Sequence, residues 1–416
     1  MYGTKSSNKN ISRLIGALCL ALLPVSGAAA LDGSLHGSMK TFFLGMYDSF
    51  QQEDLYGLSD NTLRLQGRLY PTDRLLIETA YSLSPQVFSP TLQSSGLAQG
   101  FLSAGDGSDV YRAYDFDERL VPLEAADVQN LAVYHNLDRM YASMYLPFGD
   151  VYVGRQAISW GSAHVINPTD IIAPYSFSNL NTEEKRGVDA LRLRMPVGAM
   201  SEIDIGYVAG NEFAPDASAA FARMRFYVAQ TDISFLGMDF KENLMVGIDA
   251  TRSIGGAGSW IEVAYGLPDA FSGDGPATEQ QYVSLSAGMD YNFGPKFYGY
   301  GEYHYNSAGK ADTDEYAEIE LQPGDHIAYS EGSVYLRGQH YAAVGGTYQL
   351  TPLIPVSGML LFNINDLSAN LSLNFDYNFT ENVYISGGSY LGLGKTPESE
   401  FGASPDLYYM SVKLYF

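Results

Sequence analysis

The sequence is nearly free of cysteine. Among 416 residues only Cys19 is present, inside an apolar stretch near the start of the chain. The remaining chain therefore has no thiol for a disulfide, a zinc–thiolate site or a covalently attached haem. We expect its stability to come from side-chain packing and backbone hydrogen bonds, and we predict no cofactor and no metal.

Long apolar runs are also missing. Apart from residues 14–25, no segment approaches the ~20 consecutive apolar residues that a membrane-spanning helix needs, which excludes a helical membrane protein. Yet the chain holds 32 tyrosines and 21 phenylalanines, which a compact soluble protein would have to bury. The two observations are compatible if many aromatic side chains face lipid.

Positive charge is scarce. Lys and Arg number 24 against 47 Asp and Glu, a formal net charge of −23, so nucleic acid is not an expected partner. Many acidic residues lie in irregular segments such as 115–118 and 312–315, which is typical of solvated loops. The alternative is that these loops bind divalent cations bridging to outer-membrane lipid, above all to lipopolysaccharide.

The first thirty residues have the pattern of a secretory signal peptide. Lys5, Lys9 and Arg13 precede the apolar stretch, which is followed by small residues ending in Ala28-Ala29-Ala30. We therefore predict a signal peptide over 1–30 and a single exported domain over 31–416.

The most informative pattern is strict alternation of apolar and polar residues, because a strand places successive side chains on opposite faces. A barrel wall with lipid outside and water inside produces this pattern. The last residues show it best, and they resemble the C-terminal assembly signal of outer-membrane barrels, which implies the barrel-assembly machinery as a partner. The residues of this signal are Tyr408, Met410, Val412, Leu414 and Phe416.

Alternation and turn residues together predict an all-β fold, a transmembrane antiparallel β-barrel of about eighteen strands. Sixteen strands are possible because the pattern is weak over 221–253. The number of strands argues against a soluble β-sandwich, and an even number places both termini on the periplasmic side. The predicted strands are 36–46, 61–70, 74–84, 131–147, 151–160, 188–195, 201–209, 221–229, 233–242, 244–253, 260–267, 281–293, 296–306, 338–350, 357–365, 368–379, 383–393 and 407–416.

A second resemblance lies between Val151 and Leu193. Residues 153–161 read VGRQAISWG, residues 167–170 read NPTD, and residues 185–191 read KRGVDAL. This run resembles the G-R-Q-x-x-x-W-G motif of porin-like outer-membrane proteins in the alginate-exporter group. The resemblance implies an eighteen-stranded barrel and does not extend to the solute.

Ionic side chains on the strands are predicted to face the lumen, because an Arg or Lys on the lipid face costs about 2–4 kcal/mol at mid-bilayer. We hypothesise a basic arc facing an acidic arc across the pore; the alternative is lumenal ion pairs that brace the wall. The basic arc comprises Arg64, Arg68, Arg139, Arg155, Arg192, Arg194, Arg223 and Arg225. The acidic arc comprises Asp249, Glu262, Asp290, Glu302 and Asp376.

One long connection, 161–187, is predicted to fold into the lumen as a constriction with Asp170 and Arg186 near its narrowest point, since long loops are often functional. The alternatives are an external flap, or plugs formed by 85–130 and 307–337. Inward tyrosines could also form a track for sugars, and these are Tyr298, Tyr300, Tyr384 and Tyr409.

The sequence predicts a channel for small polar solutes rather than an enzyme, since its six histidines are scattered and no nucleophile–base–orienter set is found. The predicted location is the cell outer membrane. One alternative is a structural barrel that sheathes an outer-membrane cytochrome, which would have to supply the haem because this chain has no haem-attachment motif. A surface adhesin or receptor is a third possibility.

Overall fold

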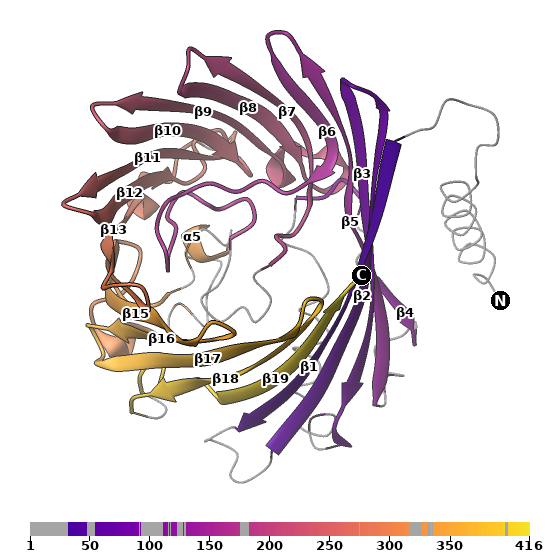
Figure 1. Cartoon of the computed structure of the whole chain (residues 1–416). Coiled ribbons are helices and arrows are strands. Elements are labelled where there is room, and N and C mark those ends of the chain that lie inside the picture. The colour runs from indigo at the N-terminus through magenta and orange to yellow at the C-terminus, as the bar shows by residue number, and fades with distance from the viewer. Residues whose placement is uncertain are drawn as a thin grey trace, which may run out of the picture.

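The computed structural model is a closed antiparallel β-barrel (Figure 1). It describes residues 32–416 apart from 48–54, 91, 93–110, 115, 117, 123–127, 129, 175–182, 274, 317–318, 320–326, 331–333, 335 and 396–397. The predicted signal peptide, 1–30, lies outside the described residues. No helix in the described part of the chain is long and apolar enough to cross a membrane.

Eighteen strands form the wall, as the alternation predicts, and β19 pairs with β1 to close the ring. The short strand β4 pairs with β5 beside this ring. The strands are β1 Asp32–Tyr47, β2 Leu55–Thr72, β3 Leu75–Phe88, β4 Glu118–Val121, β5 Leu131–Leu146, β6 Gly149–Gln156, β7 Val188–Val197, β8 Ser201–Ala209, β9 Ala219–Val228, β10 Thr231–Phe240, β11 Asn243–Ile254, β12 Ala257–Leu267, β13 Tyr282–Asn292, β14 Phe297–Asn306, β15 His340–Thr351, β16 Ile354–Asn363, β17 Ser368–Thr380, β18 Val383–Leu393 and β19 Asp406–Tyr415.

The helical elements among the described residues are short and all lie in connections. They are the helix α5 Ile327–Ser330 and the 3-10 turns η2 Asn211–Phe213, η3 Pro215–Ala217, η4 Thr278–Gln280 and η5 Thr313–Glu315.

The outer face of the wall is apolar, and its side chains are exposed. On β13, Met289 is 49% exposed and Tyr291 42%, whereas Ser284 and Ser286, on the opposite face, are buried. Closure of the sheet leaves no unpaired strand edge that hydrocarbon could not hydrogen-bond. The wall therefore has the polarity and the backbone pairing that a lipid bilayer requires.

The two ends of the barrel differ in their connections. Tight turns at one end join β2 to β3, β5 to β6, β7 to β8, β9 to β10, β11 to β12, β13 to β14, β15 to β16 and β17 to β18. Both described ends of the chain lie at this end, because Asp32 pairs with Tyr70 and Phe416 hydrogen-bonds Gly37. The longer connections lie at the opposite end; that the tight-turn end faces the periplasm remains a prediction.

The strands β9, β10 and β11 are all present, so the count of sixteen is wrong. Two features weakened their pattern in the sequence. Their turns use Ala229-Gln230 and Lys241-Glu242, which adopt positive φ without the usual glycine or asparagine. In addition, Leu236 and Met238 are apolar residues on the inner face, so both faces of β10 are apolar.

Candidate functional site

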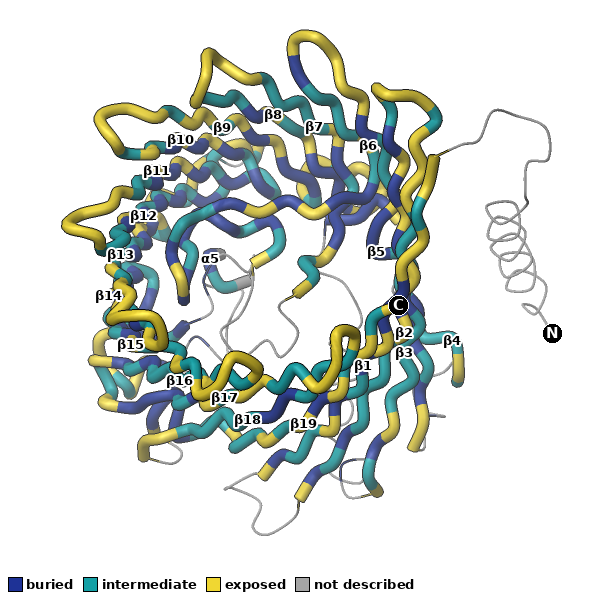
Figure 2. Tube along the Cα trace, in the orientation of Figure 1, coloured by how far each residue is buried: buried dark blue, intermediate teal, exposed yellow. Residues whose placement is uncertain are grey.

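The described parts of the connection between β6 and β7 lie inside the lumen (Figure 1). These parts are residues 157–174 and 183–187, which we call the lumenal segment. Its apolar side chains pack on the inner wall of β9–β12 in one buried cluster, and much of its chain is buried or half-buried (Figure 2). The segment contributes Ile158, Trp160, Ile171 and Ile172 to this cluster, and the wall contributes Phe221, Leu236, Met238, Phe240 and Met245.

Glu302 on β14 binds three consecutive amides of the lumenal segment. Its carboxylate accepts hydrogen bonds from the backbone N–H of His164 at 2.7 Å, Val165 at 3.2 Å and Ile166 at 3.0 Å. The indole N–H of Trp260 donates to the same carboxylate at 3.0 Å. Hydrogen bonds to a charged acceptor are about twice as strong as neutral ones, so this residue fixes the segment firmly on β14.

Glu262 on β12 binds backbone N–H groups of the lumenal segment on either side of those bound by Glu302. Its carboxylate accepts from the backbone N–H of Ser162 at 2.9 Å, Ala163 at 3.2 Å and Thr169 at 2.8 Å, and from the Thr169 hydroxyl at 2.7 Å. Its side chain is fully buried, at 0% exposed. The two predicted acidic-arc residues thus contact the protein's own backbone instead of open water.

The local sequence permits this close approach. Gly161 adopts φ +95°, and a Cβ there would lie 2.6 Å from Asn167 Oδ1 and 3.0 Å from the Glu262 carboxylate. Trp160 donates its indole N–H to the Thr169 carbonyl, which folds 160–169 into a compact hook. The tryptophan and the glycine of the sequence motif are therefore needed to shape the segment.

The second part of the lumenal segment attaches to the seam where β19 meets β1. Glu183 contacts Lys40 on β1 at 2.7 Å and Lys413 on β19 at 2.6 Å, and accepts from the Tyr415 hydroxyl at 2.7 Å. Burial would raise the pKa of Glu183, but the hydrogen bonds from Lys40, Lys413 and Tyr415 outweigh it and lower that pKa to about 2. This attachment is ionic over the ordinary pH range.

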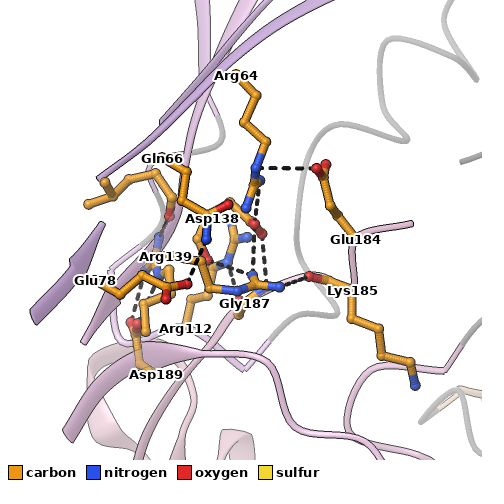
Figure 3. A network of polar contacts seen from close by, with 12 residues as sticks. Arg64, Gln66, Glu78, Arg112, Asp138, Arg139, Glu184, Lys185, Gly187 and Asp189 are labelled. Carbon is orange, nitrogen blue, oxygen red and sulfur yellow. Dashed lines mark hydrogen bonds and ion pairs between the residues drawn. The ribbon is translucent and has the colours of Figure 1, made fainter. Parts of the chain in front are cut away.

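Beyond Glu183 the segment joins a polar network on the inner wall (Figure 3). A bulge in β5 makes Asp138 an extra residue, since Ala80 pairs with Arg139 and Tyr81 with Leu137. Asp138 contacts Arg64 and Arg139, each at 2.7 Å, and accepts from the Gly187 N–H at 3.0 Å.

Arg155 and other residues of the sequence motif form ion pairs with one another or with the rest of the segment. Arg155 is 4% exposed, pairs with Asp189 at 2.7 Å and donates to the carbonyls of Leu137 and Tyr114. Lys185 pairs with Asp170 inside the segment. The motif residues thus shape and anchor the segment, and Arg155 is not open to a passing solute.

The remaining predicted basic residues lie on the inner face, most of them paired with a carboxylate from the next strand. Arg68 contacts Glu78 at 2.7 Å, Arg192 contacts Asp204 at 2.5 Å and Arg194 contacts Glu202 at 2.7 Å. Arg223 donates to the Ser234 hydroxyl at 2.8 Å, and Arg225 is exposed to the lumen. Pairing neutralises most of this wall, which favours the alternative of ion pairs that brace it.

The other predicted acidic residues take three different positions. Asp249 on β11 is buried. Asp290 on β13 accepts from the Tyr298 hydroxyl at 3.0 Å and lies 3.8 Å from the His164 ring. Asp376 on β17 is exposed and accepts a hydrogen bond from Ser386. Of these, Asp376 is the one that faces open lumen.

The two residues predicted at the narrowest point also differ. Asp170 is 3% exposed and is held by Lys185 and the Ser159 hydroxyl, so it stabilises the segment from within rather than lining an opening. Burial raises the pKa of Asp170, against the opposing effect of Lys185. Arg186 is exposed.

Sequence reasoning missed Lys40, Asp138, Glu183 and Asp189 as parts of the site. One signal was available for Asp138. Strict alternation would send either Asp138 or Arg139 into lipid at a cost of about 2–4 kcal/mol for an arginine, so the adjacent pair itself indicates a bulge.

More than half of 85–130 and less than half of 307–337 lie outside the described residues, and described parts of both contact the lumenal segment. From 85–130, Arg112 donates to the Gly187 carbonyl at 3.0 Å. From 307–337, Leu336 packs with Val165 and Ile166. A small cavity between the segment and β13–β14 is lined by Asn167, Ser284, His304 and Leu336, among others. In the part of the chain described here, no group of three metal-ligating side chains occurs.

The geometry can be compared with known proteins. No family model and no curated protein matches the sequence. Among solved structures, a BenF-like porin from Pseudomonas fluorescens Pf-5 is similar with TM-score 0.59 and 10% identity, covering 92% of this chain and 98% of that one. Pseudomonas aeruginosa OpdK with vanillate gives TM-score 0.56 and 8% identity over the same shares. Acinetobacter baumannii OccAB1 gives TM-score 0.54 and 9% identity, covering 92% and 96%. The chain has the fold of an outer-membrane porin.

Proposed function

We propose that this chain is an outer-membrane channel for passive passage of small polar or charged solutes, with the lumenal segment as its constriction. The observation that carries the proposal is the double attachment of that segment. Glu262 and Glu302 hold residues 162–169 on one side of the lumen, and Lys40 and Lys413 hold Glu183 at the seam. A wall of eighteen strands leaves an aqueous lumen, which such a segment narrows.

The comparisons support a channel and give no support to a sheath around a cytochrome. The similar structures are porins, and this chain's own segment occupies part of the lumen that a partner would need. The predicted lipid and assembly partners and the periplasmic position of the termini belong to the same proposal.

The inner wall bears on the charge of the solute. Pairing leaves few net charges on the described inner wall, so small polar solutes fit better than a polyanion. The resemblance to the alginate-exporter group rests on motif residues that contact one another inside the protein, such as Arg155 with Asp189. We therefore assign that resemblance to the shaping of the segment and not to polymer export.

Single-channel recording of the purified protein in a planar bilayer tests the proposal. We expect discrete current steps in potassium chloride. A protein that is folded, shown by slower gel migration after boiling, but inserts without any current steps would contradict it. Uptake of small neutral and charged solutes into liposomes would then give the size limit.

A further inference from the structure

Several aromatic side chains on the inner wall lie over a glycine of a neighbouring strand, and two of them are also hydrogen-bonded through their polar atom. Trp260 on β12 lies opposite Gly288 on β13, where a Cβ would come within 2.3 Å of the indole ring. Tyr409 on β19 lies opposite Gly388 on β18, where a Cβ would come within 2.8 Å of the phenol ring. Each ring therefore extends over a neighbouring glycine, close against the wall.

The polar atom of each ring reaches an acceptor on the strand beyond the glycine. The Trp260 N–H donates to Glu302 on β14 at 3.0 Å, and the Tyr409 hydroxyl donates to Asn374 on β17 at 2.8 Å. The hydrogen bond holds one edge of the ring and the glycine backbone supports its inner face, so the orientation of the ring is fixed. We call such a ring a stacking platform, because another planar group can stack on its free face.

The first platform carries a ring from the chain itself. The imidazole of His164, in the lumenal segment, stacks on Trp260 with ring centroids 4.0 Å apart and planes at 24°. Trp260 is accordingly 6% exposed. The seating thus already holds one planar group inside this protein.

The second platform is different, because Tyr409 is half-exposed on the lumenal side. Its described ring neighbours are Tyr390, with centroids 6.3 Å apart, and Phe42, at 6.4 Å, both tilted and both on adjoining strands. We infer that Tyr409 is a stacking subsite for a solute ring on the β17–β19 face of the pore. The inference names the solute class of the proposed channel and so rests on that function.

The surrounding groups indicate which ring. Asn374 offers an amide group beside the Tyr409 ring, and Asp376, two residues further along β17, offers an exposed carboxylate that would accept hydroxyl protons and repel an acid. The nearby cations Lys40 and Lys413 are both bound to Glu183. The described residues of β17, β18, β19 and β1 therefore offer a carboxylate solute no further lysine or arginine. The chemistry fits a neutral sugar ring, whose C–H face stacks on an aromatic and whose hydroxyls hydrogen-bond amides and carboxylates.

The test is block of the ion current by maltose, a neutral disaccharide, with gluconate and choline as charged comparisons. We expect Tyr409→Ala to raise the half-blocking maltose concentration about tenfold. Tyr409→Phe keeps the ring and loses the Asn374 bond, so its effect should be smaller, about threefold. The matched control is Tyr384→Ala, an inward tyrosine on β18 that stands edge-on to Tyr415 instead of over a glycine.

The outcomes separate this inference from the proposed function. An unchanged maltose block in folded Tyr409→Ala would overturn the subsite, and stronger Tyr409-dependent block by gluconate or choline than by maltose would overturn the sugar assignment. Titration calorimetry in detergent tests binding without conduction. Maltose binding that depends on Tyr409 in a barrel that passes no ions would uphold the subsite and contradict the channel.

Discussion

At the residue scale, the C-terminal phenylalanine, Phe416, packs against a glycine of β1. Phe416 and Gly37 exchange two backbone hydrogen bonds across the seam, at 2.8 and 2.9 Å, and a Cβ on Gly37 would lie 2.1 Å from the Phe416 ring. The glycine therefore lets the last ring of the predicted assembly signal lie flat against β1. The outward side chains of that signal are exposed, with Phe416 60% exposed.

We predict that Gly37→Ala slows closure of the barrel, because the methyl group displaces the Phe416 ring. The measurement is the fraction of heat-modifiable, folded protein after a fixed refolding time in detergent. Gly45→Ala, on the same strand where a Cβ meets only an ordinary contact at 3.4 Å, is the control. If Gly37→Ala lowers the folded fraction equally in a Phe416→Ala background, the two residues are not coupled, and the packing of Phe416 on Gly37 does not explain the effect.

Arg155 tests the claim that the motif arginine is structural. Its removal leaves the partly buried Asp189 without its cationic partner and frees the carbonyls of Leu137 and Tyr114. We predict that Arg155→Ala lowers the free energy of unfolding by about 3 kcal/mol, as breaking a buried pair does. Urea unfolding in lipid vesicles measures this, with the exposed Arg225→Ala as control. Equal stability of the two variants would show that Arg155 does not anchor the segment.

At the element scale, the wall strands were predictable and the lumenal contacts were not. Alternation located all eighteen wall strands, because lipid and water impose opposite polarity on successive residues. The attachment of His164 to Glu302 joins residues 138 positions apart, and that pairing exists only once the barrel has closed. β4 was missed because four residues are too few to show a period.

The inward position of most charged residues was also predictable, but their partners were not. Alternation predicts which face of the wall a residue lies on, but not which residue of the next strand lies beside it. Arg192 could therefore be placed on the inner face, whereas its pairing with Asp204 depended on the strand register. Asp170 was misplaced for a related reason, since a loop has no period from which burial can be derived.

The segment's attachment gives an element-scale prediction. Glutamine at both Glu262 and Glu302 removes the charge and offers N–H groups where acceptors are needed, so residues 162–169 should come away from the wall more often. We predict larger current noise and a higher mean conductance in single-channel recordings. Asp376→Asn, which removes an exposed lumenal charge without touching the segment, controls for charge alone. If the double glutamine variant and Asp376→Asn change current noise and conductance equally, Glu262 and Glu302 do not hold the segment on the wall.

Glu183 predicts how the seam attachment depends on pH. Its pKa is about 2 when bound to Lys40, Lys413 and Tyr415, against an ordinary 4.5 when released. A lowered pKa stabilises the bound state fully above pH 4.5, and this stabilisation is lost as the pH falls toward 2. We predict steady conductance from pH 7 to about 4.5 and a rise below it. Glu183→Gln should remove most of that rise; an unchanged pH profile in this variant would place the titrating group elsewhere.

At the scale of the whole molecule, the barrel and the segment have separate roles. The wall supplies a closed ring with a lipid-compatible exterior, and we propose that the segment attached to it sets how much of that ring is open. The porin fold is shared with proteins of at most 10% identity among those compared, so little sequence identity is needed to form such a wall.

The most direct test of this account is the single-channel conductance of a barrel in which residues 164–184 are replaced by a short glycine–serine linker. We expect a folded, heat-modifiable barrel whose conductance is several times that of the wild type, because the lumen loses its constriction. A folded barrel with unchanged conductance would show that the segment does not set the pore.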